Sequence, residues 1–118
     1  MKTLILSLLI LPSLMWAASV VNVFDAPDTG ISGLAWDGSD LWAVDGITQS
    51  VYQLDPSDGT VISNFYIEDQ TSTYDPAPAG ATFIGGYLYV AMYQGSSYGM
   101  GYKYDSSGNF QSDFDIYC

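Results

Sequence analysis

Short runs of aromatic and aliphatic residues, separated by turn-forming residues, make up nearly all of the chain after residue 19. Val51-Tyr-Gln-Leu54 alternates between apolar and polar positions, which is the period of a half-buried strand. Asp37-Gly-Ser39 and Ile84-Gly-Gly86 place glycine where a tight turn needs a positive φ. The sequence after the first residues has no convincing helical period. This pattern predicts an all-β protein.

The same pattern predicts eight strands in two groups of four. The first group is expected near Ser32–Trp36, Asp40–Asp45, Ser50–Asp55 and Thr60–Ile67. The second group is expected near Ala81–Ile84, Tyr87–Met92, Gly101–Asp105 and Asn109–Ile116. Turn residues stand between consecutive strands, so each group is predicted to form a four-stranded antiparallel sheet.

The two groups also align with each other. Gly33–Val44 aligns with Gly80–Ala91, and Val51–Gly59 aligns with Gly101–Gly108, which is one residue shorter. The spacing of about 47 to 50 residues is typical of β-propeller blades, which contain four antiparallel strands. Such modules bury their faces against neighbouring modules. We therefore predict two blades, at about 31–67 and 80–116.

A further copy of the fourth-strand pattern precedes the first group. Val20–Phe24 aligns with Val61–Phe65 and with Phe110–Phe114, which predicts an extra N-terminal strand that completes the last blade of a closed ring. Two blades and one strand cannot close a ring, because propellers have about four to eight blades. Residues 20–118 are therefore interpreted as an incomplete, partial β-propeller that needs the remaining blades of a longer chain. A ring of several chains and a small β-sandwich remain alternatives.

The first nineteen residues have the pattern of a secretory signal peptide. Lys2 provides the positive start, Leu4–Leu14 is an apolar run, and Ala17-Ala-Ser19 supplies small residues for cleavage. The run is shorter than the about 20 apolar residues of a membrane-spanning helix. An uncleaved anchor or a buried helix is the alternative. We expect residues 1–19 to be removed and the protein to be secreted or periplasmic, with no membrane span afterwards.

The charge of the chain excludes several functions. Two Lys and Arg residues stand against thirteen Asp and Glu residues, the formal net charge is −11, and His is absent. Such a chain repels phosphate backbones, so nucleic acid is not expected as a partner. Without His or Arg there is no Ser–His–Asp triad and no His-ligated zinc. We expect no catalytic residues, no metal and no cofactor. Cys118, the only cysteine, indicates either an intermolecular disulfide or a chain cut in mid-pattern.

The run Gly33–Asp45, followed by Val51–Val61, resembles the repeat of secreted bacterial β-propellers. These include the quinoprotein-like and streptogramin-lyase-like groups and the propeller of glutamine cyclotransferases. The resemblance covers most of residues 20–116. It implies the fold without implying an activity, because this repeat serves enzymes, sensors and surface proteins alike.

Two kinds of residue have both a structural and a functional interpretation. Trp36 and Trp42 are of a type that stacks on sugars, but Phe83 and Tyr89 replace them at the aligned positions, which favours packing between blades. Several aspartates resemble calcium ligands but lack the alternating spacing of an EF-hand loop, so they are predicted to cap turns. These are Asp37, Asp40, Asp55 and Asp58.

The longest connections supply the candidate binding residues. Glu68–Gly80 and Tyr93–Met100 are expected to emerge on one face of a propeller, the face that usually carries the site. Loops of this length are often functional, and tyrosine offers a large contact area at low entropic cost. The alternative is a pair of connectors without a ligand. The predicted binding rim consists of Asp45, Gln49, Tyr74, Asp75, Tyr93, Gln94 and Tyr98.

The sequence therefore predicts a secreted, noncatalytic propeller segment that serves in binding or assembly. Its partner is an unknown small molecule or protein. The resemblance leaves a second hypothesis, the N-terminal part of an extracellular propeller enzyme of the glutamine cyclotransferase-like or lactonase-like kind. In that case any catalytic residues lie beyond Cys118.

Overall fold

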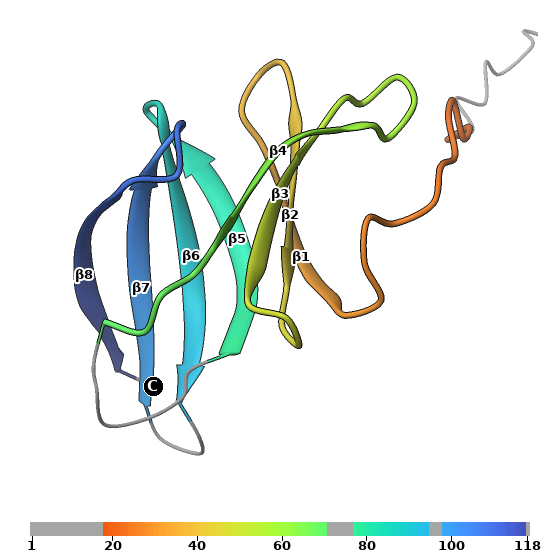
Figure 1. The fold of residues 1–118 in the computed structure, drawn as a ribbon. Coiled ribbons are helices and arrows are strands. Elements are labelled where there is room, and N and C mark those ends of the chain that lie inside the picture. Colours follow the sequence, from red (N-terminus) through yellow and green to blue (C-terminus); the bar gives the residue numbers. More distant parts are fainter. Residues whose placement is uncertain (1–17, 71–76, 95–97, 118) are drawn as a thin grey trace, which may run out of the picture.

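The structure is a computed structural model that describes residues 18–70, 77–94 and 98–117. In these ranges the chain is all-β, with eight strands in two antiparallel four-stranded sheets (Figure 1). The strands of the first sheet follow one another in chain order: β1 (Ile31–Trp36), β2 (Leu41–Asp45), β3 (Ser50–Leu54) and β4 (Val61–Tyr66). The second sheet has the same order: β5 (Ala77–Ile84), β6 (Tyr87–Gln94), β7 (Tyr98–Asp105) and β8 (Phe110–Tyr117).

The positions that align in the sequence are paired in the same way in both sheets. Leu41 pairs with Leu54, and the aligned Leu88 pairs with Tyr104. The outer strands agree as well: Val51 pairs with Phe65, and Gly101 pairs with Phe114. The four-strand prediction for each group is confirmed, with ends that shift by a few residues.

Aspartate side chains cap turns as predicted at Asp37, Asp55 and Asp58. The Asp40 carboxylate instead accepts the Gln53 side-chain amide at 2.7 Å. The Asp55 carboxylate accepts a hydrogen bond from the Ser57 amide at 2.8 Å, and the Asp105 carboxylate accepts one from the Ser107 amide at 2.9 Å. Each turn ends on a glycine with positive φ, which is 78° at Gly59 and 83° at Gly108. Aspartate and glycine are the residues that such turns require.

The two sheets pack face to face, and the core lies between them (Figure 1). Alternate residues of each strand point to opposite faces, so each sheet has an inner face toward the core and an outer face away from it. The indole of Trp42 is 1 % exposed and stacks on Phe83, with ring centroids 5.7 Å apart. Packing between the sheets is thus confirmed for Trp42. The main inner-face residues are Ala35, Trp42, Val44, Val51 and Ile67 in the first sheet, and Leu88, Val90, Met92, Tyr102 and Tyr104 in the second.

Three expectations are corrected. Trp36 lies on the outer face of the first sheet and is 52 % exposed, because it is one residue out of phase with Ala35 on the inner face. Val20–Phe24 is not a strand but an irregular segment beside the first sheet. The predicted loops are shorter, because β5 begins at Ala77 and the β6–β7 pairing continues to Gln94 and Tyr98. Gly99 pairs with Tyr93 and does not interrupt the ladder.

Within residues 18–70, 77–94 and 98–117, no helix is long and apolar enough to cross a membrane. The signal-peptide prediction for residues 1–19 falls almost wholly outside those ranges and stays a prediction.

Candidate functional site

The predicted binding rim is only partly within the described residues. Asp45 ends β2 and Gln49 lies in the following turn, at the same end of the molecule as the end of β6 and the start of β7 (Figure 1). Tyr93 is 57 % exposed near the end of β6. Gln94, which ends β6, pairs with Tyr98, which begins β7. Tyr74 and Asp75 lie outside the described residues. Whether these residues form a ligand site stays a prediction.

Asp45 has a structural task at this end of the sheet. Its side chain is 0 % exposed, and its carboxylate accepts hydrogen bonds from the amides of Gly30, Ile47 and Thr48 at 2.7–2.8 Å. Burial by itself raises the pKa of Asp45, but the amide hydrogen bonds outweigh it and leave the pKa below the ordinary value. The carboxylate thus ties Gly30, directly before β1, to the β2–β3 turn.

Gln49 is engaged in a similar way. It has a left-handed φ of 54°, its carbonyl accepts the Ile67 amide at 2.8 Å, and its side-chain oxygen accepts the Tyr66 hydroxyl at 2.9 Å. A non-glycine residue in this conformation is uncommon and is held by its surroundings. Both Asp45 and Gln49 thus stabilise the turn in the described structure.

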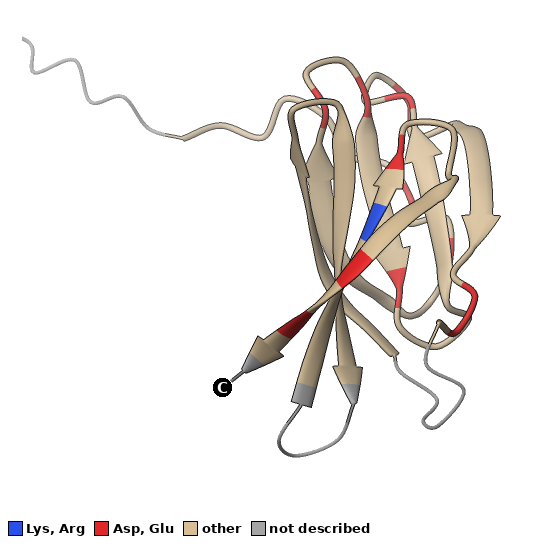
Figure 2. Cartoon of the chain, turned by 90° about the vertical axis from the view of Figure 1, so that its left-hand side faces the viewer, with Lys and Arg blue, Asp and Glu red and all other residues tan. Residues whose placement is uncertain are grey.

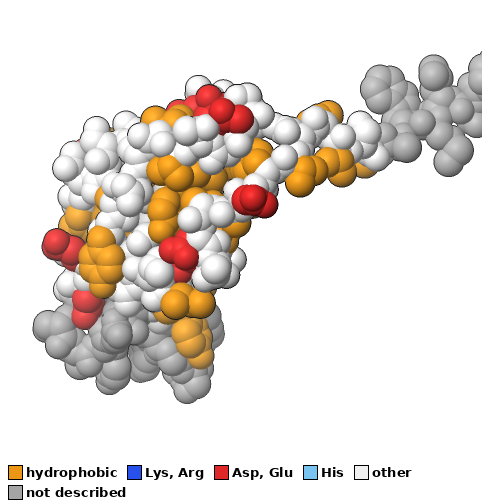
Figure 3. Space-filling view, turned by 45° about the vertical axis from the view of Figure 1, so that its right-hand side comes forward, with side chains coloured by type: hydrophobic (Ala, Val, Ile, Leu, Met, Phe, Trp, Pro, Cys, Tyr) orange, Lys and Arg blue, Asp and Glu red, His pale blue; other side chains and the backbone are white. Residues whose placement is uncertain are grey.

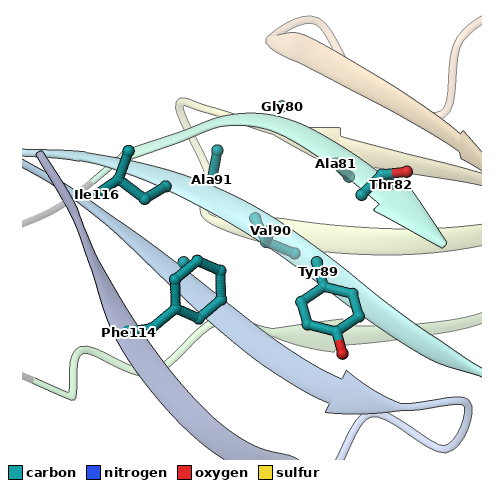
Figure 4. A pocket seen from close by; sticks show the side chains of 9 residues that line it. Gly80, Ala81, Thr82, Tyr89, Val90, Ala91, Phe114 and Ile116 are labelled. Carbon is teal, nitrogen blue, oxygen red and sulfur yellow. The ribbon is translucent and has the colours of Figure 1, made fainter. Parts of the chain in front are cut away.

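An open apolar surface lies elsewhere, on the outer face of the second sheet (Figure 4). A shallow groove of about 320 Å³ runs along β5 to β8. Small residues form its floor, and the rings of Tyr89 and Phe114 stand beside it in edge contact, with centroids 6.3 Å apart. The groove is lined by Gly80, Ala81, Thr82, Tyr89, Val90, Ala91, Gly101, Phe114 and Ile116.

The composition of this groove suits an apolar partner. Phe114 is 46 % exposed, and its ring lies over Gly101, where a side chain would collide with it. A face made mainly of glycine, alanine and aromatic rings offers shape and apolar area, and its side-chain polar groups are the hydroxyls of Thr82 and Tyr89. Its chemistry is therefore the burial of apolar surface, at about 25 cal/mol per Å².

Charged residues lie beside the groove, and none of them lines it. Lys103 of β7 lies over the ring of Tyr87, with its Nζ 3.9 Å from the ring centroid. Acidic residues stand at the turns and along β8 (Figure 2). Asp113 and Asp115 of β8 put negative charge on an edge strand, which discourages pairing with another strand at that edge.

The outer face of the first sheet differs because the chain covers it in part. Phe24 and Pro27 of the N-terminal segment, residues 20–27, enclose a cavity of about 330 Å³ against Leu34, Leu41 and Leu54. Hydrophobic side chains gather beside this segment on the surface (Figure 3). One of the two outer faces is therefore partly covered, while the groove on the other is open.

No metal centre is visible in this part of the protein. Within residues 18–70, 77–94 and 98–117, no three acidic or cysteine side chains lie close enough together to hold a metal ion.

The chain matches no family model and no curated protein.

Sequence reasoning missed the groove because it searched for sites in loops. The alignment of the two four-strand groups could have revealed it. Aligned residues should lie on corresponding faces of the two sheets, and only one face of each sheet packs on the other sheet. Two sheets that stack front to back must leave one face of each sheet without the other sheet.

Proposed function

We propose that this chain is a secreted segment of β-propeller architecture that serves in binding or assembly and not in catalysis. The observation that carries the proposal is the front-to-back packing of two sheets whose aligned residues are paired alike, with the apolar groove left open on the second sheet. Stacked modules behave in this way, each contributing a face to its neighbour. An exposed apolar surface of this kind marks a site of association.

Secretion is supported by the sequence alone. Lys2, the apolar run Leu4–Leu14 and the small residues Ala17–Ser19 are the features that signal peptidase substrates share. Mass spectrometry of the full chain expressed in a bacterial host should show export and a mature N-terminus close to residue 19. An intact N-terminus in the cytoplasm would contradict this part of the proposal.

The binding role can be tested with an apolar dye. The full chain should bind bis-ANS at the outer face of the second sheet, and Ala91→Asp should remove most of the fluorescence by placing in the groove a charge that repels the sulfonates of the dye. Ile47→Asp is the matched control, because Ile47 is 76 % exposed and lies outside the groove. Equal fluorescence from the wild type and both variants would show that the groove is no binding surface. Turnover of an N-terminal glutaminyl peptide would contradict the noncatalytic part.

A further inference from the structure

The N-terminal segment contacts the first sheet as β4 contacts the second sheet. The ring of Phe24 lies against Gly59, in the turn after β3, and the ring of Phe65 lies against Gly108, in the turn after β7. Gly59 and Gly108 are aligned positions with nearly the same φ. The segment therefore occupies the place that the outermost strand of a preceding sheet would take.

The open face of the second sheet corresponds to a face that is already paired in the first sheet. Residues of the inner face of the first sheet align with residues of this groove: Trp42 with Tyr89, Val44 with Ala91, and Phe65 with Phe114. The groove thus presents the kind of surface that receives a neighbouring sheet within the chain.

The complementary surface is present on the first sheet. Three residues that pack on or beside the core from the second sheet have aligned partners on the outer face of the first: Phe83 with Trp36, Leu88 with Leu41, and Tyr104 with Leu54. Trp36 is half exposed although it is large and apolar. A second copy of the chain therefore offers the surface that the groove fits.

We infer that the chain associates head to tail, with the outer face of the second sheet of one copy packed on the outer face of the first sheet of another. This inference rests on the proposed function. Trp36 of one copy stacks on Tyr89 of its neighbour, as Phe83 stacks on Trp42 within the chain. Phe114 then replaces Phe24 against Gly59. Such heterologous contacts form rings when they close, and a ring of about four to eight sheets takes about two to four copies.

The N-terminal segment competes with the second copy for this surface. It is held by the Asn22 side chain, which donates to the Pro56 carbonyl at 3.3 Å, and by the Tyr52 hydroxyl, which donates to Asp28 at 2.9 Å. Val21 is 95 % exposed and adds no packing. The segment therefore covers the surface through few contacts and limits association without preventing it.

The first test weakens the segment. Sedimentation equilibrium of the full chain should show that Phe24→Ala tightens association by about tenfold, because a competing state is removed. Val21→Ala is the matched control and should leave association unchanged. Association should also strengthen in high salt, since each copy has a net charge of −11. A Phe24→Ala chain that stays monomeric at every salt concentration would overturn the inference.

The second test distinguishes head-to-tail from face-to-face contact. In the Phe24→Ala background, Trp36→Asp blocks one surface and Tyr89→Asp blocks the other. Neither chain should associate alone, but an equimolar mixture should form a one-to-one complex. Self-association of the Trp36→Asp chain would show that two grooves meet each other, which contradicts the inference. Leu34→Asp and Thr82→Asp, at exposed positions of the same two faces, repeat the test if either first variant is misfolded.

The outcome is separable from that of the proposed function. If Ala91→Asp removes dye binding but the mixture forms no complex, the binding role is kept and the second copy is rejected as the partner. Absence of both rejects both.

Discussion

Gly33 of β1 and Gly80 of β5 bring the backbones of the two sheets together. A Cβ built on Gly33 would lie 2.6 Å from the Cα of Gly80, closer than any real side chain approaches a backbone. A Cβ on Gly80 would meet nothing within 4 Å, because it would point into the groove on the outer face. At this contact a side chain is thus tolerated at Gly80 but not at Gly33.

Gly33→Ala is therefore expected to push the sheets apart and to lower the free energy of unfolding by about 2 kcal/mol, the cost of overpacking. Gly80→Ala is the matched control and should change it by less than about 0.5 kcal/mol. Urea unfolding followed by tryptophan fluorescence measures both. Equal losses would mean that the sheets do not approach each other at this point.

Replacing the two tryptophans should have very different effects. Trp42→Ala removes a buried ring that stacks on Phe83 and donates from its Nε1 to Asp37 at 2.7 Å, so we expect a loss of about 4 kcal/mol in unfolding free energy. Trp36→Ala removes a half-exposed ring and should cost less than about 1 kcal/mol. Thermal unfolding compares them. A larger loss of unfolding free energy for Trp36→Ala than for Trp42→Ala would contradict the burial of Trp42 on the inner face and the exposure of Trp36 on the outer face.

Tyr102 and Tyr104 provide a test of hydroxyl pairing. Both rings are buried, but the Tyr102 hydroxyl accepts the Gln70 amide at 3.3 Å, whereas the Tyr104 hydroxyl has no partner among the residues described. Tyr104→Phe should be neutral or stabilise by up to about 1 kcal/mol, and Tyr102→Phe should destabilise by about 1 kcal/mol. Denaturant midpoints for the two variants decide this, and a loss from Tyr104→Phe would show that its hydroxyl is paired.

Asp45 should make the free energy of unfolding depend on pH in the acid range. Its pKa is lowered in the folded protein, so its contribution is complete above the unfolded pKa of about 3.9 and is lost as the pH falls through the folded pKa. Urea midpoints measured from pH 6 down to pH 2 should fall, and they should fall less steeply for Asp45→Asn. Parallel curves for the two proteins would show that Asp45 carries none of the acid dependence.

Removing the carboxylate altogether should be costly at every pH. Asp45→Ala leaves the amides of Gly30, Ile47 and Thr48 without their acceptor, for which we expect a loss of about 3 kcal/mol at pH 7. The comparison is Asp58→Ala, whose exposed carboxylate accepts the Thr60 amide at 2.9 Å. A loss of equal size from the two variants would contradict the anchoring role of Asp45.

Much of the fold was predictable because strand alternation and turn chemistry are local properties. The aspartate–glycine turns and the eight strands follow from short stretches of sequence. Which face of a strand is covered is not local. Trp36 and Trp42 both lie in strands, and only the pairing of Trp42 with Ala35 places Trp36 on the opposite face.

The candidate site was harder to predict for the same reason. Asp45 is predicted as part of the binding rim, and in the structure its carboxylate accepts hydrogen bonds from three backbone amides. The Val20–Phe24 pattern matched a strand, but a strand also needs an edge to pair with. In the described structure the segment contacts a turn through Phe24 and Asn22 and pairs with no strand.

The repeated Phe–Gly contact has a consequence for how such a protein changes in length. Phe24 against Gly59 and Phe65 against Gly108 use the same pair of residue types on successive sheets. A unit of four strands inserted between the two sheets would contact, on each side, the same kind of surface that the two sheets now present to each other. Growth or shrinkage by whole units therefore needs no new kind of contact, whereas the gain or loss of a single strand would disturb every junction after it.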